Sequence, residues 1–257
     1  MESDGIRVGV LGPVRAWRDG VPLHLGGPRQ RAFLAMLVFR PGWVHPAEEL
    51  SDGIWGDLAP ARVGQSLRTY ASRLRRVLSC ADVPNPLVCS GGGYALRLPE
   101  TSTVDLSEFG ALTRAARETP DPGAAAVLLR RALELVKGQA MSGVDGPFAE
   151  RRRAEWEERR LSTVEEVLRL DLACGRHHAA AAELTAFCRA HPFRERATGY
   201  LMTALYRAGR QADALRVYTG VRRRLAEEFG VDPGPALQET YLRIVRADPG
   251  LLTACSV

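Results

Sequence analysis

The stretch QSLRTYASRLRRVL, residues 65–78, decides how the N-terminal part of this sequence is interpreted. At about 100° per residue, its apolar and small side chains fall on a single stripe of an α-helix. The stripe consists of Leu67, Tyr70, Ala71, Leu74 and Leu78. This pattern predicts a helix that buries one side in a hydrophobic core and exposes the other.

The side expected to be exposed is basic and polar, and positions 61–79 contain no acidic residue. A helix face that is only solvated more often carries Glu at four-residue spacing from Lys or Arg. Gln, Thr, Ser and Arg side chains can hydrogen-bond to phosphates or base edges. We therefore interpret this face as a DNA-binding face, with a merely solvated basic face as the alternative. Its candidate residues are Gln65, Arg68, Thr69, Ser72, Arg73, Arg75 and Arg76.

The composition bounds the class of protein without identifying it. The chain has 257 residues and a net charge of +5, and all its basic residues except Lys137 are arginines, so arginine alone is weak evidence for a polyanion partner. Five scattered cysteines favour a reducing cytoplasm over a disulfide framework. No signal peptide or apolar run of about 18 residues is visible. We expect no membrane partner and a cytoplasmic, nucleoid-associated location.

Residues 1–98 mix strand and helix patterns. Alternating apolar residues predict strands in IRVGVLG and VRAWRDGVPLHL, where Asp19-Gly20 is a hairpin turn signal. Helices are expected at residues 28–39, 46–55 and about 62–79. Two short strands should then enclose a tip of Gly91, Gly92 and Gly93, with Tyr94 and Arg97 beside it. Strands, three helices and a hairpin are the order of a winged helix-turn-helix domain, and Tyr94 and Arg97 join the DNA-binding candidates.

Residues 103–248 are expected to be helical throughout, and residues 249–257 form a C-terminal tail. Prolines and glycines divide this region into helices at about residues 106–118, 123–137, 147–174, 178–190, 194–208, 211–229 and 235–247. The fold class is therefore α+β followed by all-α.

A repeat runs through the last of these helices. Gly175 and Gly209 are 34 residues apart, and four further pairs keep that offset: Val167 and Leu201, Ala180 and Ala214, Leu184 and Tyr218, Phe187 and Val221. Helix pairs with a 34-residue period are typical of tetratricopeptide repeats. The pattern predicts a tetratricopeptide-like domain, although any helical bundle places small residues at turns and contacts.

Several segments together resemble a known family. LGGPRQRAFLAML, EELSDGIWGD, QSLRTYASRLRRVL and GGGYALRL resemble, in that order, the DNA-binding domain of the Streptomyces antibiotic regulatory protein family. VDLSEFGAL, GRHHAAAAEL, HPFRERATGYLMTALYRAGRQADALRVY and EEFGVDPGPALQETYLRIVRAD resemble its bacterial transcriptional activation domain. The resemblance covers about residues 5–248.

The resemblance implies an OmpR-like winged helix, then a tetratricopeptide-like domain, in an activator of a secondary-metabolite (antibiotic) gene cluster. Such activators bind direct repeats in promoter DNA near the −35 region and recruit RNA polymerase holoenzyme, including its sigma factor. By position, the third helix is the recognition helix, with Thr69, Ser72 and Arg73 facing the groove and Arg75 and Arg76 toward phosphates. A loop containing Asp57, Leu58 and Ala59 occupies the place where related winged helices touch polymerase. A homodimer on DNA is a further expectation, because a single winged helix covers little sequence.

Other chemistry is weakly indicated. Cys174, His177, Cys188 and His191 have a C-x2-H spacing that zinc sites use, but the cysteines fall at repeat packing positions, so we expect no metal. No Gly-x4-Gly-Lys-Ser/Thr motif is present, and no nucleophile stands beside a base in sequence, so we expect no nucleotide cofactor and no enzyme activity. The rival hypothesis is a tetratricopeptide scaffold whose N-terminal domain binds protein instead of DNA.

Overall fold

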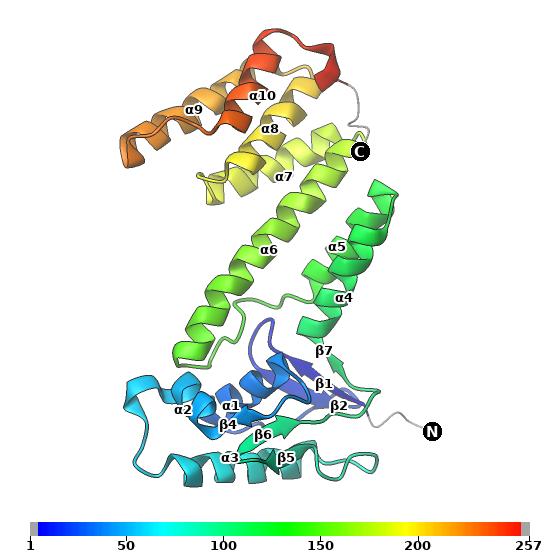
Figure 1. The fold of residues 1–257 in the computed structure, drawn as a ribbon. Coiled ribbons are helices and arrows are strands. Elements are labelled where there is room, and N and C mark those ends of the chain that lie inside the picture. The colour runs from blue at the N-terminus through cyan, green and yellow to red at the C-terminus, as the bar shows by residue number, and fades with distance from the viewer. Residues whose placement is uncertain (1–4, 253–257) are drawn as a thin grey trace. The chain divides into compact units, whose positions relative to one another are not determined.

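The computed structural model describes residues 5–252, which form two compact packing units. Unit 1 contains the described residues up to Arg114 together with Arg131–Arg160. Unit 2 contains Ala115–Arg130 and the described residues from Leu161 onward. The chain is mostly helical, with its strands confined to the N-terminal region (Figure 1). Each unit has its own hydrophobic core and is described separately.

The first sheet of unit 1 has the strand order β3-β2-β1-β7. Its strands are β1 (Ile6–Gly9), β2 (Arg15–Arg18), β3 (Val21–Pro22) and β7 (Thr103–Val104). Asp19 and Gly20 connect β2 to β3 with φ of 51° and 80°, so the Asp-Gly hairpin signal is confirmed. The expectation of helix throughout residues 103–248 is wrong at its start, because Thr103 and Val104 pair in parallel with Arg7 and Val8. A two-residue strand is too short for side-chain periodicity to reveal.

Three helices follow the first three strands, as the sequence predicts. They are α1 (Pro28–Phe39), α2 (Ala47–Trp55) and α3 (Val63–Leu78), with a 3-10 turn η1 (Gly56–Leu58) between the second and third. The third helix, expected at about residues 62–79, begins at Val63, so Gly64 lies within α3. α1 packs against both α2 and α3 and is buried along most of its length.

The second sheet of unit 1 has the order β4-β6-β5, from β4 (His45–Pro46), β5 (Leu87–Ser90) and β6 (Gly93–Leu96). The β5–β6 hairpin is confirmed, but its tip contains two glycines, Gly91 and Gly92, with φ of 55° and 77°. Gly93 was expected in the tip and instead pairs with Ser90 inside the hairpin. A side chain on Gly93 would collide with the main-chain oxygen of His45, because β6 is the central strand.

Later parts of the chain complete the core of unit 1. The core includes Met141, Phe148 and Trp156, which are buried with residues of the first strands and α1–α3. The ring of Trp156 packs edge-on against that of Phe109, with ring centroids 4.6 Å apart. The elements involved are α4 (Asp105–Glu118), α5 (Pro122–Glu134) and α6 (Pro147–Ala173). Arg153 donates hydrogen bonds to the main-chain oxygens of residues 140, 141 and 144 and so fixes the segment before α6.

Asp105 joins the start of α4 to the loop after β1. Its carboxylate accepts hydrogen bonds from the N–H groups of Val10 and Leu11, both at 2.8 Å, and from Leu106 at 2.7 Å. Burial raises the pKa of Asp105, and the three main-chain N–H groups oppose this shift. The side chain therefore satisfies donors that would otherwise be buried without acceptors.

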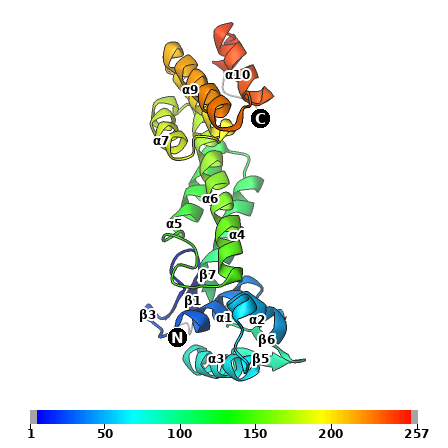
Figure 2. The same cartoon turned by 90° about the vertical axis from the view of Figure 1, so that its left-hand side faces the viewer.

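Unit 2 is built around α8 (Glu195–Arg207), which packs against α7 (His177–Ala190), α9 (Gln211–Phe229) and α10 (Pro235–Val245). A 3-10 turn η2 (Pro249–Leu251) follows α10. α9 and α10 also contact each other, as both views indicate (Figure 1 and Figure 2). None of the helices within residues 5–252 is long and apolar enough to span a membrane.

The 34-residue offset has a structural counterpart in unit 2. Gly175 and Gly209 end helices with φ of 77° and 75°, where glycine is favoured. The next residues, Arg176 and Arg210, each donate their N–H to the oxygen five residues back, at 3.0 and 2.8 Å. Three offset pairs are buried at both positions: Ala180 and Ala214, Leu184 and Tyr218, and Val167 and Leu201. In the pair Phe187 and Val221, Phe187 is only half-buried. Burial therefore recurs at most of the positions related by the offset.

We expect Asp105→Ala to destabilise the protein by about 1–3 kcal/mol, because the N–H groups of Val10 and Leu11 lose their acceptor. The free energy of unfolding measured by urea denaturation checks this value. Asp82→Ala, at an exposed position after α3, is the matched control and should change it by less than about 0.5 kcal/mol. Equal effects of the two substitutions would contradict the role given to Asp105.

Candidate nucleic-acid interface

The apolar stripe of α3 anchors the helix in unit 1. Leu67, Ala71, Leu74 and Leu78 are at most 1% exposed, which confirms the predicted buried side. Tyr70, at the edge of the stripe, is half-buried and stacks on Trp55 of α2 with ring centroids 6.1 Å apart. Because four consecutive turns are anchored, the rotation of α3 about its own axis is fixed.

The opposite side of α3 faces solvent. Its exposed residues are Gln65, Arg68, Thr69, Ser72, Arg73 and Arg76, which are six of the seven candidates from this helix. The hydroxyl of Thr69 donates to the main-chain oxygen of Gln65 at 2.9 Å, so its oxygen remains available as an acceptor. The structure thus brings these six side chains together on one carboxylate-free helix face.

Arg75 is the seventh candidate, and it contacts the neighbouring hairpin. The side chain is half-buried, and its Nε and Nη2 both donate to the main-chain oxygen of Leu87, at 3.1 and 2.8 Å. This links α3 to the start of β5. The position of Arg75 near the stripe edge was a signal of this role, but the acceptor, twelve residues away, could not be identified from the sequence.

Arg18 is a residue of this region that sequence reasoning missed. Its Nη2 donates to the main-chain oxygens of Val77 and Ser79, at 3.2 and 2.8 Å. These carbonyls lie at the C-terminal end of α3, where main-chain oxygens lack partners within the helix and a positive charge is favourable. Nothing in the local sequence of β2 indicates this long-range contact.

The hairpin places its two candidates differently. Arg97 is exposed, and its main-chain N–H donates to the oxygen of Pro86 at 2.7 Å. Tyr94 is only 6% exposed, and its ring packs edge-on against that of Phe33 with ring centroids 5.4 Å apart. Burial raises the pKa of Tyr94, with the charges of Arg68 and Arg75 acting against the shift. The ring of Tyr94 therefore supports the hairpin from the core, whereas its expected DNA contact would need an exposed side chain.

The loop between α2 and α3 exposes its three candidates, Asp57, Leu58 and Ala59. Leu58 is 83% exposed, the highest exposure among the large apolar side chains given for the described residues. The loop follows a helix end at Gly56, whose φ is 55°. This arrangement presents one apolar side chain, flanked by a carboxylate, on the surface of unit 1.

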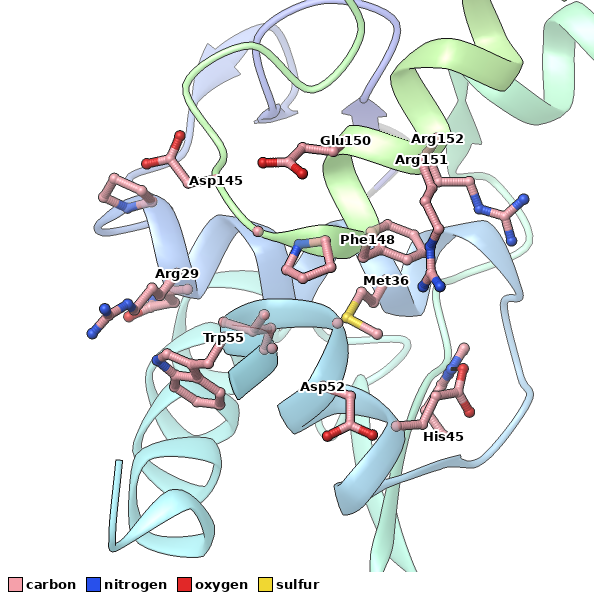
Figure 3. A pocket seen from close by; sticks show the side chains of 18 of the residues that line it. Arg29, Met36, His45, Asp52, Trp55, Asp145, Phe148, Glu150, Arg151 and Arg152 are labelled. Atoms are coloured by element: carbon pink, nitrogen blue, oxygen red, sulfur yellow. Dashed lines mark hydrogen bonds and ion pairs between the residues drawn. The ribbon is translucent and has the colours of Figure 1, made fainter. Parts of the chain in front are cut away.

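A cleft of about 1500 Å³ lies in unit 1 beside α3 (Figure 3). Its walls come from α1, α2 and residues 145–155, and Tyr70 and Arg73 of α3 reach its edge. Figure 3 shows basic and acidic side chains on its walls, among them Arg29, Arg151, Asp52, Asp145 and Glu150. A cleft of mixed charge does not favour a polyanion. The exposed face of α3 is therefore the better candidate interface.

The two C-x2-H pairs, at which we expect no metal, lie at opposite ends of α7. His177 begins α7 and Cys188 lies eleven positions later, near its end, a rise of roughly 17 Å along the helix. Burial raises the pKa of the Cys188 thiol to about 11, so it stays protonated at neutral pH. No group of three or more potential ligands occurs within the described part of the chain. The two Cys-His pairs are thus too far apart to share an ion.

Comparisons with known proteins agree on a class. Residues 104–245 match the family model of the bacterial transcriptional activator domain. The chain is 49% identical to regulatory protein AfsR of Streptomyces coelicolor over 97% of its length, although it spans only 25% of AfsR. It is 32% identical to regulatory protein DnrI of Streptomyces peucetius, covering 96% of this chain and 94% of DnrI.

A solved structure extends the likeness to three dimensions. Mycobacterium tuberculosis EmbR, in complex with a low-affinity phosphopeptide, superposes with a TM-score of 0.91 at 33% identity. The match covers 96% of this chain and 66% of EmbR. These matches define a bacterial transcriptional regulator. The chain belongs to the Streptomyces antibiotic regulatory protein family of transcriptional activators, as the sequence resemblance indicated.

We expect Arg75→Ala to lower the free energy of unfolding by about 1–2 kcal/mol, because Leu87 O loses both donors. Arg76→Ala removes the same charge from an exposed position one residue on, and should change it by less than about 0.5 kcal/mol. Thermal and urea unfolding of both variants measure the difference. If the two variants unfold alike, the link from α3 to β5 contributes nothing to stability.

Proposed function

We propose that this protein is a sequence-specific, DNA-binding activator of a secondary-metabolite gene cluster, acting in the cytoplasm. The observation that carries the proposal is the exposed face of α3, which is rich in arginine and hydroxyl or amide side chains and lacks any carboxylate. Membership in a family of transcriptional activators supports the same function.

In this proposal, residues 1–98 form an OmpR-like winged helix with α3 as its recognition helix. The order α1, α2, α3 and the β5–β6 hairpin supports this assignment. α3 would lie in the major groove, because its polar face projects away from the core that holds it. The glycine tip of the hairpin and Arg97 would then approach the adjacent backbone or minor groove as the wing.

The exposed side chains divide by chemistry. Arg73 can make a bidentate contact with guanine, and Thr69 and Ser72 can contact either base edges or phosphate oxygens. Gln65, Arg68 and Arg76 would hold the helix in register through phosphates and neighbouring bases. Arg75 uses two of its donors on Leu87 O, so its contribution to DNA binding would be mainly to fix α3 against the hairpin.

Residues 103–248 would form the tetratricopeptide-like activation domain, followed by the tail at 249–257. Burial and helix-end glycines that recur at a 34-residue offset support the repeat assignment. We propose that the protein binds direct repeats near the −35 region as a homodimer and recruits RNA polymerase holoenzyme. The exposed loop of Asp57, Leu58 and Ala59 would contact the polymerase, including its sigma factor.

We expect Arg73→Ala to lose preference for the cognate operator by about 1–3 kcal/mol, since one bidentate base contact is removed. Arg76→Ala should weaken cognate and unrelated duplexes alike and reduce the salt dependence of binding. Fluorescence anisotropy with promoter fragments of the neighbouring genes, at several salt concentrations, measures both effects. Arg114→Ala, an exposed arginine of α4, is the control. Absence of salt-dependent duplex binding by the unmodified protein would favour the protein-binding scaffold instead.

We expect Leu58→Ser to abolish most activation while leaving DNA affinity unchanged, because Leu58 is exposed and lies outside the α3 face. Transcription in vitro with purified holoenzyme, run beside an anisotropy measurement on the same promoter, separates the two steps. Leu252→Ser makes the same change at an exposed position outside the proposed activation domain and should keep activation. Full activation by the Leu58 variant would remove this loop from the polymerase contact.

A further inference from the structure

Unit 2 contains a pocket of about 570 Å³ that the proposed function does not use. It lies among the C-terminal end of α6, one side of α8, the start of α10 and the turn η2. The apolar part of its lining includes Leu172, Leu237 and Leu251, which are all at most 6% exposed. Gly199, in the middle of α8, leaves the space beside Leu237 and Thr240 free of a side chain.

The charged part of the lining is strongly biased toward one sign. Four arginines line the pocket against one carboxylate, that of Glu195: they are Arg169, Arg196, Arg207 and Arg243. Glu195 already accepts a hydrogen bond from the N–H of Gly234 at 2.7 Å, at the start of α10. The carboxylate of Glu195 therefore already accepts a hydrogen bond at the wall of the pocket. The lining residues together carry a net positive charge.

The arginines differ in what they contact. Arg169 and Arg243 are paired with Glu166 and Asp248, at 2.8 and 2.7 Å, and neither carboxylate lines the pocket. Arg207 donates to the main-chain oxygens of Leu172 and Leu251, at 3.1 and 2.6 Å. These hydrogen bonds hold its guanidinium group beside two apolar lining residues. Burial of the ring lowers the pKa of His177, and the positive charge of Arg207 acts in the same direction.

We propose that this pocket binds a small amphipathic carboxylic acid. The carboxylate is held by the guanidinium groups, chiefly Arg207 and Arg196, and the apolar part lies on Leu172, Leu237 and Leu251. The volume is in the range that small-ligand sites occupy, roughly 300–1,000 Å³. Planar guanidinium groups suit carboxylates because they can donate two parallel hydrogen bonds. The site depends on unit 2 alone and does not rest on the DNA-binding proposal.

The chemistry favours a small acid over an acidic peptide. A peptide bound in extended form rises about 3.3 Å per residue and needs main-chain partners along its length. The hydroxyls of Thr203 and Thr240 on the lining already donate within their own helices, to Gly199 O and Ala236 O at 2.9 Å. The positive charges and the apolar residues are instead concentrated within one compact pocket, as a single acid group with an apolar body requires.

The test compares octanoate with octan-1-ol by isothermal titration calorimetry on the full chain. The two probes share their apolar chain and differ in the carboxylate. We expect octanoate to bind at a single site, at least about tenfold tighter than octanol, because the alcohol lacks the charge-assisted contacts. Arg196→Gln should weaken octanoate about fivefold with little effect on octanol. Ala173→Phe, which fills the pocket from the end of α6, should abolish binding of both.

Arg189→Gln is the matched control, because Arg189 is exposed on α7 and does not line the pocket. It should leave octanoate affinity unchanged. Since Arg196 is exposed, its variant tests the proposal even if Ala173→Phe fails to fold. Equal binding of octanoate and octanol, equal weakening by Arg189→Gln, or no octanoate binding would overturn the proposal. Binding of a short acidic, leucine-rich peptide without octanoate binding would also overturn it, in favour of a peptide site.

Discussion

The burial of one side of α3 is the constraint on which the proposed DNA interface depends. Leu67, Ala71, Leu74 and Leu78 leave the helix a single orientation, because turning it would expose these side chains and bury arginines. Burying a leucine side chain contributes roughly 1.5–3 kcal/mol. The position of every polar side chain on the other face then follows from helix geometry. The guanidinium groups of Arg75 and Arg18 donate to main-chain oxygens and so fix the C-terminal half of α3 to its surroundings.

Local sequence signals, namely turn residues, helix-end residues and apolar periodicity, predicted most of the helices and turns of the structure. The helix at Pro28–Phe39, the buried stripe of α3 and the Asp19-Gly20 turn depend on residues within a few positions of one another, where the sequence is informative. Contacts between distant segments were not predictable. The pairing of β7 with β1 joins residues about a hundred positions apart, and β6 needs Gly93 because His45 passes directly beside it.

The same difference between local signals and long-range contacts explains which candidate site residues were placed correctly by the sequence. Six candidates on α3 are exposed as the helical angle predicted, since that angle is a local property. Tyr94 and Arg75 differ because their surroundings come from other elements: Phe33 of α1 packs against the tyrosine, and Leu87 of β5 accepts from the arginine. In a single sequence, a residue beside a motif cannot be distinguished from one that supports it. The repeat in unit 2 was visible because its contacts recur at a fixed offset.

Packing units and sequence motifs divide this chain at different places, and the difference has a physical cause. The winged-helix pattern ends near residue 98, yet Asp105, Phe109, Met141 and Trp156 contribute to the core or hydrogen bonds of unit 1. A small domain with two short sheets buries little apolar surface by itself. The segment from Arg131 to Arg160 adds side chains such as Phe148 to that core and is held by Arg153. A sequence motif marks the residues expected to contact a partner. A packing unit also includes the residues that hold those contact residues in place.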